Sequence, residues 1–105
     1  MKLFAMTMAA LAGALSLAAG AHAAQPEDRQ ARVWAASCAA CHGTSGKAVA
    51  DGIPSIQGTS KEVILQKLLA FRQGTLPATV MHQHAKGYTE AELERIAAYF
   101  SRQSR

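Results

Sequence analysis

The chain has 105 residues, and its 11 lysines and arginines outnumber its 7 aspartates and glutamates, which gives a net charge of +4 with neutral histidines. The basic residues are scattered, and no basic run with interleaved aromatic residues occurs, which argues against a nucleic-acid partner. The mild positive charge instead suits docking to an acidic protein.

The N-terminal segment has the layout of a secretory signal peptide. Lys2 precedes an uncharged run at 3–21 that is rich in alanine and leucine, and the run ends in an Ala-x-Ala pattern at 21–23. This predicts a signal peptide at 1–23 and one domain at 24–105, exported to the periplasm and without stable membrane insertion. An uncleaved membrane anchor is the alternative, because the run is nearly long enough to span a bilayer.

The domain at 24–105 opens with a predicted helix over about 26–37. A proline in the first turn and the acidic side chains of Glu27 and Asp28 suit a helix N-terminus. Trp34 lies one turn before Cys38 on the same helix face. We therefore expect the indole to pack beside whatever Cys38 binds, or against another helix.

The helix leads into Cys38-Ala39-Ala40-Cys41-His42, a Cys-x-x-Cys-His motif that indicates covalent attachment of one c-type haem. Two thiols about one helical turn apart can each add to one of the two vinyl groups on a haem edge. His42 is then held beneath the porphyrin, where a ring nitrogen can bind the iron as the proximal ligand. Trp34 is a further candidate for contact with the haem.

Three other interpretations of the two cysteines are weaker. A redox dithiol is expected after a strand in a βαβ pattern, which the sequence lacks. A zinc site built from Cys38, Cys41, His82 and His84 departs from the usual spacing of paired histidine ligands. A disulfide between the cysteines closes too small a loop to add much stability. Covalent haem also suits a small domain, because it supplements a core that is otherwise marginal.

Residues 43–59 are predicted to form a loop, because glycines recur in this segment and no hydrophobic period is sustained. A loop this long is uncommon in a compact domain unless something orders it, and a haem can do so. Pro54 lies in an extended part of the loop, and we expect its carbonyl to accept a hydrogen bond from the second ring N–H of His42. Ile53 and Ile56 would then line the pocket on the histidine side.

A second helix is predicted from Thr59 to Gly74. Thr59 and Glu62 have the spacing of a capping box, a wide apolar face follows, and Gly74 is a natural stop. The last helix is predicted after Tyr88, with a second capping box and with four apolar residues on one face that should pack on the first helix. These four residues are Leu93, Ile96, Ala97 and Phe100.

The loop at 75–84 holds the candidate for the second axial ligand. Met81 is the only methionine after position 23, and thioether sulfur is a common sixth ligand of haem iron. In an extended loop the side chains alternate in direction, so His82 and His84 should face away when Met81 faces the iron. A slip of one residue would reverse this, and either histidine would then compete with Met81.

Together these residues resemble a class I cytochrome c over nearly all of 24–105. The similarity is to small bacterial cytochromes that include the haem subunit of flavocytochrome c sulfide dehydrogenase. The features that carry it are the haem motif, Pro54 and Gly58 in the following loop, Met81 before Ala85-Lys86-Gly87-Tyr88, and Ala97-x-Tyr99-Phe100 in the last helix.

The resemblance implies an all-α fold of three to four short helices around one covalent haem, with the first and last helices crossed. It also implies that Pro54 supports His42 and that Met81 is the axial ligand. The implied function is that of a periplasmic single-electron carrier without a substrate of its own. Its partners would be redox proteins, such as a flavoprotein dehydrogenase or a terminal oxidase. From the positive charge of the chain, we expect some of Lys47, Lys61, Lys67 and Lys86 to surround the exposed haem edge and to dock an acidic partner.

Two alternatives remain open. The chain could be the electron-accepting cytochrome subunit of a sulfide- or sulfur-oxidising flavoenzyme complex. A catalytic or gas-sensing haem with an open iron position is weaker, because Met81 would fill that position.

Overall fold

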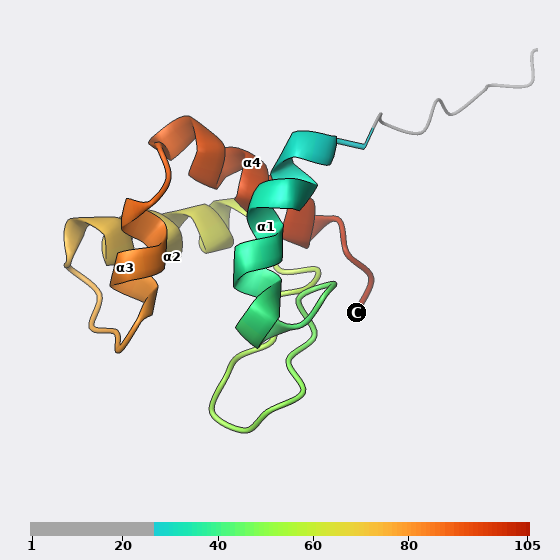
Figure 1. The fold of residues 1–105 in the computed structure, drawn as a ribbon, viewed down its shortest axis with the longest axis horizontal. Coiled ribbons are helices and arrows are strands. Elements are labelled where there is room, and N and C mark those ends of the chain that lie inside the picture. The colour runs from blue at the N-terminus through green and yellow to red at the C-terminus, as the bar shows by residue number, and fades with distance from the viewer. Residues whose placement is uncertain (1–26) are drawn as a thin grey trace, which may run out of the picture.

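The computed structural model describes residues 27–105, and this part of the chain is all-helical, as predicted (Figure 1). The helices are α1 (Arg29–His42), α2 (Lys61–Gln73), α3 (Met81–Lys86) and α4 (Glu90–Ser101). The predicted signal peptide at 1–23 lies outside the described residues. Among residues 27–105, no helix has the length and apolar character needed to cross a membrane.

Helices α1 and α4 pack across each other, which confirms the predicted crossing of the first and last helices (Figure 1). At the contact α1 presents Ala31 and Ala35, which are 0% and 1% exposed. Their small side chains let the two backbones approach closely. The face of α4 that packs here is the predicted one, with buried side chains at Leu93, Ile96, Ala97 and Phe100.

Helix α1 begins later and ends later than predicted. It starts at Arg29, and the Asp28 side chain is the N-cap, which accepts a hydrogen bond from the Ala31 N–H at 3.0 Å. The helix continues through the cysteine motif to His42, because alanines at the two intervening positions favour helix. Gly43, at φ +89° and ψ +154°, ends it.

Helix α2 starts one residue later than the predicted capping box. Its N-cap is Ser60, whose hydroxyl accepts the Val63 N–H at 3.3 Å. The capping role predicted for Thr59 is wrong, because the Thr59 N–H donates to the Ile56 carbonyl and belongs to the preceding turn. The helix ends at Gly74 in the left-handed conformation, as predicted.

The segment predicted as an extended loop at 75–84 contains the first four residues of α3. Its N-cap, Val80, makes no side-chain capping hydrogen bond, so the sequence carries no start signal for this helix. Ala85, which is 1% exposed, anchors the helix in the core. Side chains from 81 onward therefore follow helical periodicity, and the predicted alternation of neighbouring side chains is wrong.

Helix α4 has the predicted capping box. The Thr89 hydroxyl accepts the Glu92 N–H at 3.2 Å, and the Glu92 carboxylate accepts the Thr89 N–H at 2.8 Å. The long loop after α1 is tied to this helix, since the Gly58 N–H donates to the Phe100 carbonyl at 3.0 Å. The loop that forms part of the site described next is thus fixed to one of the crossed helices.

Candidate haem-binding site

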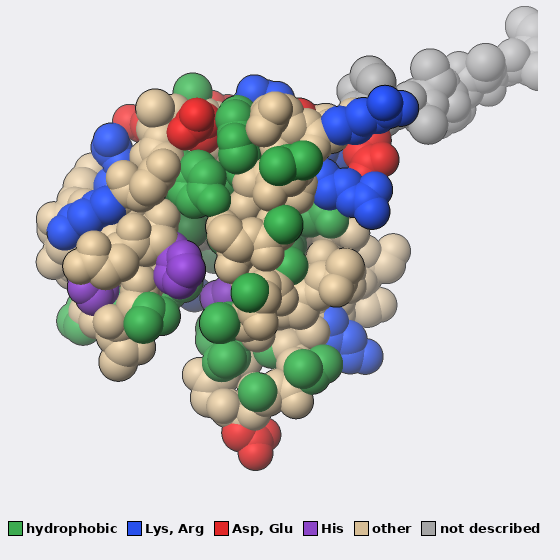
Figure 2. Space-filling view, in the orientation of Figure 1, with side chains coloured by type: hydrophobic (Ala, Val, Ile, Leu, Met, Phe, Trp, Pro, Cys, Tyr) green, Lys and Arg blue, Asp and Glu red, His purple; other side chains and the backbone are tan. Residues whose placement is uncertain are grey.

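A cleft opens between the end of α1 with its following loop and α3 with its preceding loop (Figure 2). Its volume of about 630 Å³ falls within the range of about 300–1,000 Å³ that is typical of cofactor pockets. Most of its lining is apolar. The large apolar residues in it are Ile53, Ile56, Val63, Ile64, Leu68, Phe71, Leu76, Val80, Met81, Ile96 and Phe100.

The last turn of α1 brings the cysteine motif to one wall of this cleft. Cys38, Cys41 and His42 all line it. Cys38 is half-buried, Cys41 is exposed, and both thiols are free rather than joined in a disulfide. His42 is buried, at 8% exposure. The motif therefore presents two thiols and one imidazole to a single apolar space.

The hydrogen bond predicted between His42 and Pro54 is present. The Nδ1 atom of His42 lies 2.7 Å from the Pro54 carbonyl oxygen. Because a carbonyl oxygen only accepts, Nδ1 carries the proton, and Nε2 keeps a lone pair that a metal can accept. Ile53 and Ile56 line the same side of the cleft, as predicted.

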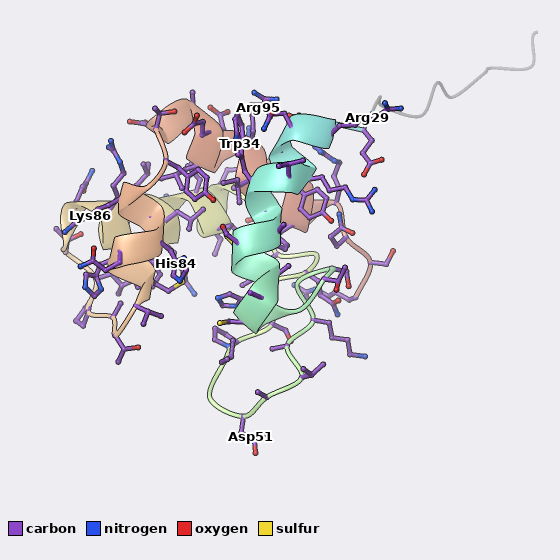
Figure 3. All side chains as sticks on the ribbon, in the orientation of Figure 1. Arg29, Trp34, Asp51, His84, Lys86 and Arg95 are labelled. Carbon is purple, nitrogen blue, oxygen red and sulfur yellow. The ribbon has the colours of Figure 1, made fainter. Side chains whose placement is uncertain are left out.

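The opposite wall is formed by α3 and α2, and it contains Met81. His84 lines the cleft as well, and in Figure 3 its side chain points from α3 into the space between α3 and α1. His82 is not among the lining residues. The expectation that both histidines face away is wrong for His84, because residues three apart share one face of a helix.

Trp34 packs against a helix and does not line the cleft. The guanidinium of Arg95, from α4, lies over its ring at 4.6 Å from the centroid (Figure 3). We expected the Trp34 indole either beside the group that Cys38 binds or against another helix, and the structure shows it against another helix. We therefore do not include Trp34 in the haem contacts proposed below.

Several lining residues were recognised in the sequence only as members of helical core faces. Phe71 of α2 and both Ile96 and Phe100 of α4 line the cleft. Leu76 and Val80, from the loop before α3, were not identified at all. For Phe71 the sequence did contain a signal, because the apolar face of α2 is wider than packing against a single helix requires.

The other interpretations of the cysteines fit this geometry poorly. Burial raises the pKa of the Cys38 thiol, whereas a reactive dithiol needs a lowered pKa. Within residues 27–105, no group of three or more histidine, cysteine, aspartate or glutamate side chains is placed to hold a metal ion. The proposed zinc ligands are therefore not brought together. An apolar cleft with a free imidazole nitrogen, a thioether and two thiols matches the donor set of c-type haem.

Comparisons with known proteins give a consistent result. Residues 25–100 match the family described as cytochrome c oxidase, cbb3-type, subunit III. The chain is 44% identical over 78 residues to the cytochrome subunit of sulfide dehydrogenase from Chlorobaculum tepidum, which covers 74% of this chain and 70% of that protein. It is 34% identical over 70 residues to cytochrome c-554(548) from Halomonas halodenitrificans. The aligned region covers 64% of this chain and 84% of that protein.

A further relative is longer than this chain. It is the thiosulfate dehydrogenase electron acceptor from Stutzerimonas stutzeri, 34% identical over 67 residues that make up 61% of this chain and 31% of the relative. With the cleft, the Cys-x-x-Cys-His motif and the family match over 25–100, these similarities show that the chain belongs to this family of c-type cytochromes and is an electron-transfer protein.

Proposed function

We propose that this cytochrome carries single electrons through one haem, attached covalently to Cys38 and Cys41 and bound axially by His42 and Met81. The observation that supports this most directly is the 2.7 Å hydrogen bond between His42 Nδ1 and the Pro54 carbonyl. It fixes the tautomer and the ring orientation that an iron ligand needs, and it raises the basicity of Nε2.

When bound, the haem supplies the one-electron iron couple. The residues of the chain would hold and tune it: Cys38 and Cys41 would attach the haem covalently, the apolar lining would exclude water, and the Met81 sulfur would favour the softer ferrous state. Pro54 lacks an N–H, so its extended segment offers His42 an acceptor only. These features favour a high reduction potential relative to a bis-histidine site.

We infer that the chain is exported to the periplasm by the segment at 1–23. There it would accept electrons from a dehydrogenase that oxidises sulfide or another reduced sulfur compound. The names of two relatives, a sulfide dehydrogenase subunit and a thiosulfate dehydrogenase electron acceptor, support this class of donor. The second candidate is a permanent cytochrome subunit of such an enzyme, and the high identity to the sulfide dehydrogenase subunit favours it.

Haem attachment is tested by expressing the full chain in a bacterial host with c-type maturation and measuring its mass after acid-acetone extraction. We expect the mass of residues 24–105 plus one haem, with an N-terminus at Ala24. The Cys38→Ala, Cys41→Ala double variant should lose the haem completely. A wild-type mass that matches bare polypeptide would overturn the proposal.

The two partner hypotheses are separated by purifying the native protein under mild conditions. A free carrier should elute alone and be reduced by added dehydrogenase over many turnovers. A permanent subunit should elute in stoichiometric complex with a flavoprotein and be reduced within that complex.

A further inference from the structure

We propose that His84 is a second distal ligand, which binds the haem iron when Met81 detaches. This inference rests on the proposed function, since it requires haem in the cleft with Met81 as the resident ligand. It differs from the expectation for an extended loop, in which His82 and His84 were equivalent competitors.

The helical register of α3 separates the two histidines. Met81 and His84 are three residues apart, so their Cβ atoms lie about 5–6 Å from each other on one face. His82 is rotated by about 100° from Met81 around the helix axis, because α-helices have about 3.6 residues per turn. The structure agrees, since Met81 and His84 line the cleft and His82 does not.

A second, smaller cavity beside Cys38 also has both Met81 and His84 in its lining. The two side chains therefore share two adjacent spaces, and the smaller one adjoins a cysteine that anchors the haem. In Figure 3 His84 points into the space between α3 and α1, on the side where α1 carries the motif. Its imidazole thus lies next to Met81 on the wall that faces His42.

The two ends of α3 are held differently. At the first turn the N-cap residue Val80 is 53% exposed and makes no side-chain capping bond. Beyond the last turn the Tyr88 hydroxyl donates to the Trp34 carbonyl of α1 at 3.2 Å, and Ala85 is buried. The start of α3 therefore lacks a side-chain cap, although Met81 itself packs against the apolar core, and His84 lies beside the end that is tied to α1. Movement that withdraws Met81 leaves His84 at the cleft wall.

Binding of His84 would change the iron in two ways. The imidazole fills the position that Met81 leaves, so small molecules such as carbon monoxide gain no open site. The potential falls, because nitrogen favours the ferric state more than thioether sulfur does. Met81 detachment would therefore give a closed, low-potential form rather than a reactive one.

The test compares Met81→Ala with two double variants that add His84→Ala or the matched control His82→Ala. We expect Met81→Ala and its His82→Ala partner to stay six-coordinate and low-spin by absorption and electron paramagnetic resonance. The variant lacking His84 should be high-spin. If His84 occupies about 90% of the iron sites, its removal should raise the apparent carbon monoxide affinity of the ferrous protein about tenfold.

Identical spectra and carbon monoxide affinities in both double variants would overturn the role of His84. If Met81→Ala does not accumulate, wild type and His84→Ala are warmed until the weak far-red sulfur-to-iron band disappears. Wild type should then remain low-spin and His84→Ala become high-spin, and high-spin iron in both would again overturn the inference.

A failure of the proposed function looks different. Wild-type protein without covalent haem would overturn both proposals. Covalent haem without the far-red band would show that Met81 is not the resident ligand, and His84 would then not be its substitute. A wild type with the band, combined with double variants that behave alike, would leave the proposed function standing and remove only the role of His84.

Discussion

The proposed pair of axial ligands depends on single side chains, and the sulfur atom sets Met81 apart from its apolar neighbours. Met81→Leu keeps an apolar side chain of similar volume and removes the sulfur. We expect this variant to lose the far-red band and to have a lower reduction potential in a redox titration, because the ferrous state loses its soft ligand. A potential that is unchanged within error would mean that the sulfur does not bind the iron.

Asp28, the N-cap of α1, and Arg95, in the middle of α4, join the two crossed helices. The Arg95 guanidinium reaches both carboxylate oxygens of Asp28 at 2.7 Å. This hydrogen-bonded pairing, followed by the bond from the Ala31 N–H, holds the pKa of the Asp28 carboxyl well below its usual range. The same guanidinium stacks on Trp34.

The lowered pKa makes this contact pH-dependent in a defined direction. Stabilisation by Asp28 is fully present above its unfolded-state pKa of about 3.9 and is lost as the pH falls below it. Asp28→Asn keeps the N-cap acceptor and removes the charge. Its Tm should be below that of wild type at pH 7, and the two Tm values should converge as the pH falls below 4. A constant difference would exclude the ion pair as its cause.

Prediction from sequence gave the local hydrogen bond between His42 and Pro54 correctly. The two cysteines and His42 are contiguous, and the acceptor at Pro54 follows from the absence of an N–H and from the extended backbone there. The orientation of His84 could not be predicted, because it depends on whether the backbone at 81–86 is helical. A six-residue helix without an N-cap signal takes its stability from tertiary contacts, here the burial of Ala85.

At the scale of elements, the stop after α1 positions the loop that supports His42. Gly43 lies at φ +89° and ψ +154°, a region that is essentially restricted to glycine, and a Cβ there would lie 2.0 Å from the Lys47 carbonyl oxygen. Gly43→Ala should therefore lower the free energy of unfolding by about 1–3 kcal/mol or more. It should also disturb the haem spectrum, because the Pro54 segment must shift.

Gly74→Ala is the matched control for this prediction. Gly74 ends α2 at φ +76° and ψ +13°, but nothing lies within 4 Å of the position that a Cβ would take. The expected cost is about 1–2 kcal/mol for the left-handed conformation alone, with an unchanged haem spectrum. Equal costs and unchanged spectra for both variants, measured by denaturant unfolding and absorption, would show that the Gly43 contact relaxes without moving the loop.

The helices with capping residues were predictable to within one or a few positions. The Thr89 and Glu92 box gave the start of α4 correctly, because both side chains bond reciprocally at fixed spacing. At the start of α2, Thr59 and Ser60 both carry a hydroxyl that could cap the helix. Ser60 is the N-cap, because the hydrogen bond from the Thr59 N–H to the Ile56 carbonyl places Thr59 in the preceding turn. That bond depends on the loop conformation, which sequence spacing does not encode.

At the scale of the whole molecule, the apolar core is small. The largest fully buried side chains among residues 27–105 are Phe100, Leu93 and Ile96. More large apolar side chains line the cleft than fill this core. The domain is thus expected to depend on the haem for much of its apolar burial.

Loss of the covalent haem should consequently reduce the fraction of folded protein as well as the haem absorption. We expect the Cys38→Ala, Cys41→Ala double variant to have weak helical circular dichroism and to be degraded by a protease that wild type resists. Met81→Leu, which retains both thioether bonds, is the control and should keep its helical signal. A double variant with wild-type helicity and cooperative unfolding would mean that the protein core is sufficient alone.

The charge around the cleft determines how partners approach. Of the four lysines expected near the haem edge, only Lys67 lines the cleft, whereas Lys61 pairs with Glu94 at 3.0 Å. The rim also exposes Val63 and Val80, at 42% and 53%. We therefore expect docking to combine one local cation and the net positive charge of the chain with an apolar surface.

This combination predicts a salt dependence that is specific to Lys67. Oxidation of the ferrous protein by anionic hexacyanoferrate(III), measured by stopped flow, should slow as salt is raised, because screening weakens the attraction beyond about 10 Å at 0.1 M. Lys67→Gln should be slower at low salt and less sensitive to salt. Lys61→Gln removes the same charge from a residue that does not line the cleft, so it should change the rate less. The cationic oxidant tris(phenanthroline)cobalt(III) should show the opposite salt trend. If the oxidation rates with both oxidants are independent of ionic strength, charge does not guide docking, and the apolar rim would be its only basis.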